Sequence, residues 1–227
     1  MNWSVEVSGV QSRRHFCSSM VVDKRVLKTK GQLTRQRLIE GAFRCIARDG
    51  LLATTFQSIA DETGYSQPLV VRYFGTKEEI FPTTIRYFVD LARIKTEKAL
   101  KNRATSTRAL DLLKIYLEVS FEIFLSSRDL RAFYLSIYGH SPYEETVRII
   151  NQEIRAHAVA RIGHILKRGM ESDDFHFEIP IDDMARAIHS ALTGALMNWI
   201  LDDHEYDATK GSAIVDLIAH GVCARKT

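Results

Sequence analysis

Residues 34–75 contain three short apolar stretches at helical spacing, and a glycine closes each of them. In the first stretch, Ile39, Ala42 and Phe43 begin a repeat at i, i+3 and i+4 that continues for two turns, the pattern of one buried helix face. The stretch stops at Gly50, because glycine readily adopts the left-handed conformation that ends many helices. Such closely spaced stops predict a small unit of helices joined by brief turns.

The second and third stretches are almost continuous. Threonines at 54 and 55 are N-cap candidates for a second helix, which should end at Gly64. Residue 66 or 67 can cap a third helix, and Pro68 suits its first turn because no backbone N–H is needed there. The third helix should therefore run over residues 69–74.

A capping box at residues 76–79 predicts the start of a fourth, long helix. Thr76 would be its N-cap and Glu79 its N3 residue. Pro82 would then lie about six residues inside the helix, remove one backbone hydrogen bond and bend it. This bend makes the long helix the candidate lever of a conformational change.

The remaining sequence predicts five more helices, at residues 107–125, 128–138, 143–170, 181–201 and 208–224. The chain has only 12 glycines and 4 prolines among 227 residues, fewer than average, so turns should be rare. Neither βαβ alternation nor a strand-like alternation of any length occurs. The expected fold class is all-α.

Several functions and locations are disfavoured by simple absences in the sequence. The sequence contains no apolar run of about 18 residues, so no membrane span is predicted. Residues 1–20 lack the apolar core of a secretory signal. Cys17, Cys45 and Cys223 are far apart, which favours a reducing, cytoplasmic compartment and free thiols. We find no catalytic or phosphate-loop motif and no metal-ligand spacing, so we expect no enzyme, metal or cofactor. Translation from Met20 instead of Met1 is a further hypothesis.

The net charge of +3 is unevenly distributed along the chain. Residues 1–23 are neutral, residues 24–80 carry +4 and residues 81–227 carry −1. Six basic residues and no acidic one lie between positions 24 and 37. This stretch indicates either a polyanionic partner or a merely solvated tail.

Two helices joined by a turn of about three residues form the outline of a helix-turn-helix unit. Within it stand the strings Thr55-Phe56-x-x-Ile59-Ala60-x-x-x-Gly64-x-Ser66 and Tyr73-Phe74-x-x-Lys77-Glu78-x-Ile80. Together they resemble the DNA-binding domain of the tetracycline-repressor (TetR) family of bacterial transcription regulators. The resemblance implies a flexible arm at residues 1–32, a helix-turn-helix DNA-binding domain at 33–80, and a larger helical ligand-binding and dimerisation domain at 81–227.

The resemblance also implies which residues meet DNA. Residues at the start of the third helix would face base edges, and others would meet the phosphate backbone. These DNA-binding candidates are Thr55, Gln57, Ser66, Gln67, Pro68, Leu69, Arg72, Tyr73 and Lys77. Arg72 is the candidate for a guanine or a phosphate, whereas Tyr73 could equally be a half-buried core ring. Val71 departs from the family, which often has an aromatic residue there.

In the larger domain, the resemblance implies a small-molecule pocket and a homodimer. The pocket candidates are Phe121, Phe124, Phe133, Tyr134, Ile137 and Tyr138, although an aromatic stripe at helical spacing can also be plain core. Residues 110–138 supply few candidate inward-facing charges, so a mostly apolar effector is expected. The dimer candidates are Ile188, Ala191, Leu192, Ala195, Trp199, Ile214, Leu217 and Ile218, unless their stripes pack only within the subunit.

These features predict a homodimeric repressor that binds a double-stranded DNA operator and is released by a small effector. The alternative is a helical ligand-binding or scaffold protein that keeps the helix-turn-helix shape without regulating DNA.

Overall fold

The first described helix, α2 (Lys30–Asp49), begins at a capping box whose Thr-x-x-Gln pattern, residues 29–32, is present in the sequence but is not among the predicted helix starts. The computed structural model describes residues 29–103, 108–125, 127–201 and 208–223. Within them the Thr29 hydroxyl accepts a hydrogen bond from the Gln32 backbone, and the Gln32 side chain accepts one from the Thr29 N–H. The prediction that the arm extends to residue 32 is therefore wrong at its end. Residues 1–28, with both candidate start methionines, lie outside the described part.

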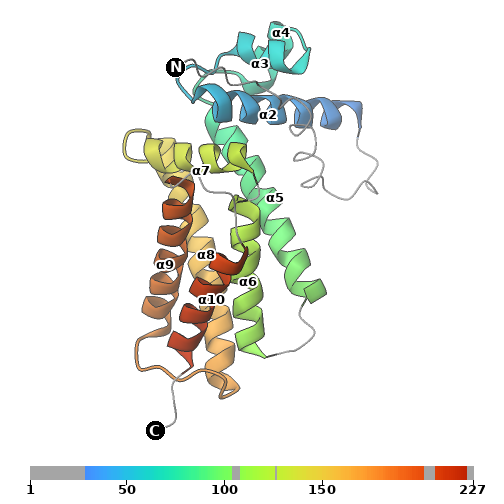
Figure 1. The fold of residues 1–227 in the computed structure, drawn as a ribbon. Helices are drawn as coiled ribbons and strands as arrows, with labels where there is room; N and C mark the ends of the chain where they lie inside the picture. The colour runs from blue at the N-terminus through green and yellow to red at the C-terminus, as the bar shows by residue number, and fades with distance from the viewer. Residues whose placement is uncertain (1–28, 104–107, 126, 202–207, 224–227) are drawn as a thin grey trace, which may run out of the picture.

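Eight more helices follow α2 in the described residues, which contain no strand. They are α3 (Phe56–Thr63), α4 (Gln67–Phe74), α5 (Ile80–Arg103), α6 (Ala109–Leu125), α7 (Arg128–His140), α8 (Glu145–Glu171), α9 (Ile181–Leu201) and α10 (Ala208–Val222). Helices α2 to α4 form a head, and α5 runs from this head along a bundle of α6, α8, α9 and α10 (Figure 1). Helix α7 lies across the top of the bundle, against α2. The all-α prediction is confirmed.

The predicted capping box at residues 76–79 does not form, and α5 starts at Ile80. Residues 76–79 make a hydrogen-bonded turn instead, in which the Ile80 N–H donates to the Lys77 carbonyl at 3.2 Å. Pro82 is consequently the third residue of α5, where a backbone N–H has no helical acceptor in any case. The predicted bend at Pro82 thus loses its physical basis.

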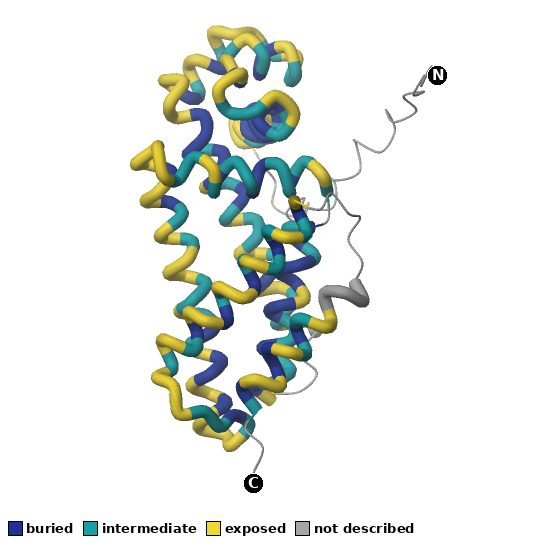
Figure 2. Tube along the Cα trace, turned by 60° about the vertical axis from the view of Figure 1, so that its left-hand side comes forward, coloured by how far each residue is buried: buried dark blue, intermediate teal, exposed yellow. Residues whose placement is uncertain are grey.

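One apolar core joins the head to the top of the bundle. Phe43 of α2 packs against Phe88 of α5 and Phe133 of α7, with ring centroids 4.3 and 5.1 Å apart. Phe81 packs edge-on against Phe133 at 5.7 Å. Because α7 and α8 also contribute Ile137 and other buried residues, the head's core extends well beyond residue 80. Figure 2 shows that buried positions alternate with exposed ones along these helices.

A second core fills the bundle between α6, α8, α9 and α10. Phe175, in the loop after α8, is fully buried against Gly169. The neighbouring Asp174 carboxylate accepts a 2.9 Å hydrogen bond from the Ala109 N–H at the start of α6. This loop therefore closes the lower end of the bundle. None of the described helices is both long and apolar enough to cross a membrane.

Candidate nucleic-acid interface and internal cavity

Helix α4 buries one face and presents the other to solvent. Val70 and Phe74 are buried, whereas Gln67, Pro68 and Arg72 are exposed. The turn before α4 depends on Gly64, whose φ of 71° lies in the left-handed region. Of the remaining predicted contacts on α4, Ser66 is exposed and Leu69 is partly buried against the head's core.

The start of α3 is held by a reciprocal cap. The Thr55 hydroxyl accepts from the Ser58 N–H at 3.1 Å, and the Ser58 hydroxyl accepts from the Thr55 N–H at 2.8 Å. The exposed Gln57 side chain donates to the Asp61 carboxylate at 2.7 Å. Both predicted contacts on α3 therefore lie at the surface with local partners.

A cross-helix contact brings Arg35 of α2 to Tyr73 of α4. The Arg35 Nε donates to the Tyr73 hydroxyl at 2.7 Å, and its guanidinium lies 5.9 Å from the ring centre. Tyr73 is only half-buried, so this pair reaches solvent beside Arg72. Sequence reasoning counts Arg35 only as one of six basic residues at 24–37, and no local signal identifies its partner 38 positions away.

Lys77 occupies a different position from the one predicted. It lies in the turn before α5, and its Nζ donates to the Leu52 carbonyl at 3.0 Å. This bond joins the turn to the loop that precedes Thr55. Lys77 is exposed, so its charge remains on the surface near the start of α3. It is not at the amino end of α5.

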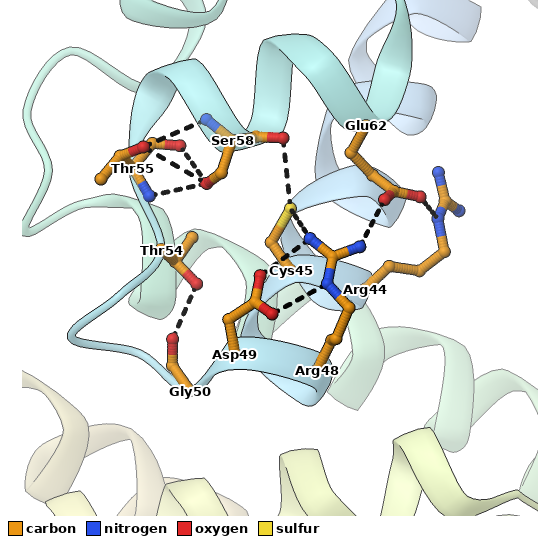
Figure 3. A network of polar contacts seen from close by, with 9 residues as sticks. All are labelled: Arg44, Cys45, Arg48, Asp49, Gly50, Thr54, Thr55, Ser58 and Glu62. Atoms are coloured by element: carbon orange, nitrogen blue, oxygen red, sulfur yellow. Dashed lines mark hydrogen bonds and ion pairs between the residues drawn. The ribbon is translucent and has the colours of Figure 1, made fainter. Parts of the chain in front are cut away.

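A polar clamp holds α3 against α2 (Figure 3). The Glu62 carboxylate accepts from Arg44 at 2.6 Å and from Arg48 at 2.9 Å. Partial burial alone would raise the pKa of Glu62, but the hydrogen bonds from the two arginines outweigh it and lower that pKa. Arg48 also pairs with Asp49 at 2.8 Å. The clamp fixes α3, and with it the turn that presents α4.

A cavity of about 790 Å³ that is open to solvent lies between α5, α6, α7, α8 and α9. Five of the six predicted pocket residues line it: Phe124, Phe133, Tyr134, Ile137 and Tyr138. Phe121 is instead buried next to Trp199, with ring centroids 5.8 Å apart, beside a smaller cavity of about 250 Å³.

As expected, residues 110–138 contribute only uncharged residues to the cavity lining. Charged lining residues come instead from α5 and α8, among them the exposed Arg93, Glu97 and Arg155. His157, His164 and His189 also line the cavity. No cluster of three or more potential metal ligands occurs in the part of the chain that the structure describes.

The predicted dimer residues divide into two groups. Ile188, Leu192 and Ile218 are at most 8% exposed and belong to the subunit's own core, so they are not available to a partner. The others reach the surface of α9 and α10: Ala191, Ala195, Trp199, Ile214 and Leu217. Leu217 is 69% exposed, which is unusual for a leucine unless another surface covers it.

The sequence is similar to those of known transcription regulators. The profile of the bacterial regulatory proteins of the tetR family matches residues 38–83. The HTH-type transcriptional regulator BetI of Rhizobium meliloti (strain 1021) is 32% identical over 114 residues, which make up 50% of this chain and 55% of that protein. In that alignment the chain thus spans about half the length of its relative.

Solved structures share the fold over most of the chain. A transcriptional regulator from Saccharomonospora viridis in complex with choline has a TM-score of 0.71 at 21% identity, with 85% of this chain and 99% of that chain covered. The regulator FadR from Bacillus subtilis in complex with stearoyl-CoA has a TM-score of 0.68 at 18% identity, with 82% and 98% covered. At these identities the likeness is one of fold.

Proposed function

We propose that this chain is a dimeric repressor that a small molecule releases from its operator. Its residues 38–83 match the tetR family of bacterial regulatory proteins. The observation that carries the proposal is the exposed face of α4, with Gln67 and Arg72 beside the Arg35–Tyr73 pair. A helix with this exposure and flanking positive charge suits the major groove.

Base recognition is assigned to the amino end of α4. Gln67 can bond bidentately to adenine, and Pro68 can contact a thymine methyl group. Arg72 is positioned one turn further along the same exposed side, where guanine or phosphate is its natural partner. Arg35, Tyr73 and Lys77 then hold the phosphate backbone on either side, with Thr55, Gln57 and Ser66 adding local contacts.

Dimerisation is assigned to the exposed parts of α9 and α10. Ala191 and Ala195 would permit close helix approach, and Trp199, Ile214 and Leu217 would supply apolar area. Two such helices from each subunit form a four-helix interface. The dimer must hold its two α4 helices about 34 to 36 Å apart, or a multiple of this, to read a palindrome.

Release of the operator is assigned to a ligand in the large cavity. The structural relatives crystallised with choline and with stearoyl-CoA support a small-molecule effector for this fold. A ligand shifts the dimer away from the DNA-binding arrangement only by its differential affinity for the two states. Phe133 links the two regions, because it lines the cavity and also packs on Phe43 in the head.

Selection of bound sequences from a random DNA pool tests the proposal. We expect a palindromic site whose binding weakens steeply between about 50 and 200 mM salt yet remains stronger than binding to bulk DNA. Gln67→Ala should relax base preference, and Lys77→Ala should weaken all sequences alike. Gln152→Ala, at an exposed position of α8, is the control. Binding without any sequence preference would favour the helical scaffold alternative.

A further inference from the structure

The large cavity changes in polarity from its interior to its rim. In the interior, the rings of Phe124, Tyr134 and Tyr138 make tilted contacts with centroids 4.6 and 4.9 Å apart. Tyr134 is buried, and burial raises the pKa of its hydroxyl, so this region is apolar and uncharged. The charged lining residues lie on α5 and α8 instead, and Arg86 and Arg155 among them are exposed. A ligand that fits both regions is amphipathic.

The charge at the rim is positive once ion pairs are considered. Arg93 lies 3.5 Å from Asp90, and Arg161 lies 3.2 Å from Glu97, so two carboxylates of the lining already have cationic partners. Of the remaining charged lining residues, Arg86 and Arg155 are positive and only Glu153 is negative. No carboxylate of the described residues lies within ion-pair distance of Arg155.

His189 of α9 adds an unsatisfied polar atom to the same site. Its Nδ1 is buried and, among the described residues, is the one buried side-chain nitrogen or oxygen with no hydrogen-bond partner. Burial lowers the pKa of His189, and the positive charge of Arg155 on α8 lowers it further. His189 of α9 and Arg155 of α8 therefore line the same part of the cavity. A buried unpaired nitrogen costs free energy unless a group outside the chain satisfies it.

We infer that the cavity binds an amphipathic anion, with its apolar body against the Phe124–Tyr134–Tyr138 rings and its anionic head between Arg155 and His189. A carboxylate accepts hydrogen bonds from a guanidinium and from a neutral imidazole N–H. It would also supply the negatively charged partner that Arg155 lacks among the described residues. This inference rests on the proposed function only in treating the cavity as the effector site.

Other ligand classes match the site less well. A quaternary ammonium ion needs open aromatic faces or free carboxylates, but the three rings pack on one another and Glu153 alone is unpaired. A neutral apolar molecule would leave both Arg155 and the His189 Nδ1 without a partner. The head-group charge thus becomes the property that separates the candidate ligands.

Three probes of equal chain length test the inference: laurate, 1-dodecanol and dodecyltrimethylammonium, each below its micelle-forming concentration. Calorimetric titration of the full chain, without DNA, should give laurate an affinity at least about tenfold higher than that of the other two. Arg155→Gln should weaken laurate binding by about tenfold or more and leave dodecanol binding unchanged. Arg168→Gln is the matched control, because Arg168 is an exposed arginine of the same helix outside the cavity lining.

Four results would overturn the inference: no laurate binding, equal binding of the three probes, tighter binding of the cation, or equal laurate affinities of the Arg155→Gln and Arg168→Gln proteins. Sequence-specific DNA binding is measured separately and without any probe. A protein that selects an operator but ignores laurate contradicts only the anion inference, and one that binds laurate but selects no sequence contradicts only the proposed repressor.

Discussion

Gly41→Ala should disturb the packing that orients α3 and α4, the helices proposed to bind DNA. Gly41 is buried in α2 beside the carboxyl end of α3, and a Cβ atom built there would clash with Cγ2 of Thr63. Real Cβ atoms essentially never come so close to another atom, so Thr63 must move. Its hydroxyl is held by the Ile59 carbonyl at 2.7 Å, and it directly precedes the Gly64 turn into α4.

Two opposing terms set the size of the effect. Forced overpacking of this kind costs about 1 to 3 kcal/mol. Alanine favours a helix interior over glycine by about 1 kcal/mol. We therefore expect a net loss of about 1 kcal/mol in the free energy of unfolding, together with weaker operator binding. Thr63→Ser removes the clashing methyl and keeps the hydroxyl, so in that background Gly41→Ala should become neutral or stabilising.

Urea denaturation of the wild type, both single variants and the double variant measures this coupling as a double-mutant cycle. Gly163→Ala is the control, because its added Cβ meets no atom closer than 4.0 Å and should only gain helix stability. The reasoning is refuted if Gly41→Ala changes stability by the same amount with threonine and with serine at position 63, or if it stabilises the wild type as Gly163→Ala does.

Three further predictions concern the clamp, the shared core and the loop cap. The pKa of Glu62 is lowered in the folded state, so its stabilising contribution is complete above the usual carboxyl value and is lost as the pH falls; Glu62→Gln should flatten the loss of stability between about pH 5 and pH 3 in urea titrations. Phe133→Ala should cost about 3 to 5 kcal/mol of unfolding free energy, and a loss below about 1 kcal/mol would contradict a core shared by head and bundle. Asp174→Asn should lower thermal stability by an amount equivalent to about 1 kcal/mol, because the lowered pKa of Asp174 reflects its hydrogen bond from Ala109 at the start of α6; an unchanged melting temperature would contradict this.

Local signals in the sequence predict the head well. The glycines at 50, 64 and 75 do end α2, α3 and α4, since each adopts a positive φ that other residues rarely reach. The start of α5 is predicted wrongly from the same kind of local signal. The Thr76 box is a sound local pattern, but residues 76–79 form a turn, and Lys77 in this turn donates a hydrogen bond to the Leu52 carbonyl, 25 positions away.

The candidate sites depend on contacts that no local pattern encodes. The α9 stripe from Ile188 to Trp199 includes both core and surface positions, because a helix packed on one side can carry small residues on the other. Arg35 meets Tyr73 only after the head has folded. Likewise, the charges at the cavity rim come from α5 and α8, whose orientation follows from packing.

The double use of Phe133 restricts how the cavity can be remodelled during evolution. A substitution there reshapes the cavity wall and, in the same step, removes a ring that packs on Phe43 and Phe81 in the core below α3 and α4. Leu112, Tyr138 and Thr193 line the cavity without belonging to that aromatic stack. New ligand specificities should therefore arise by substitutions at such positions, while the ring at 133 is retained.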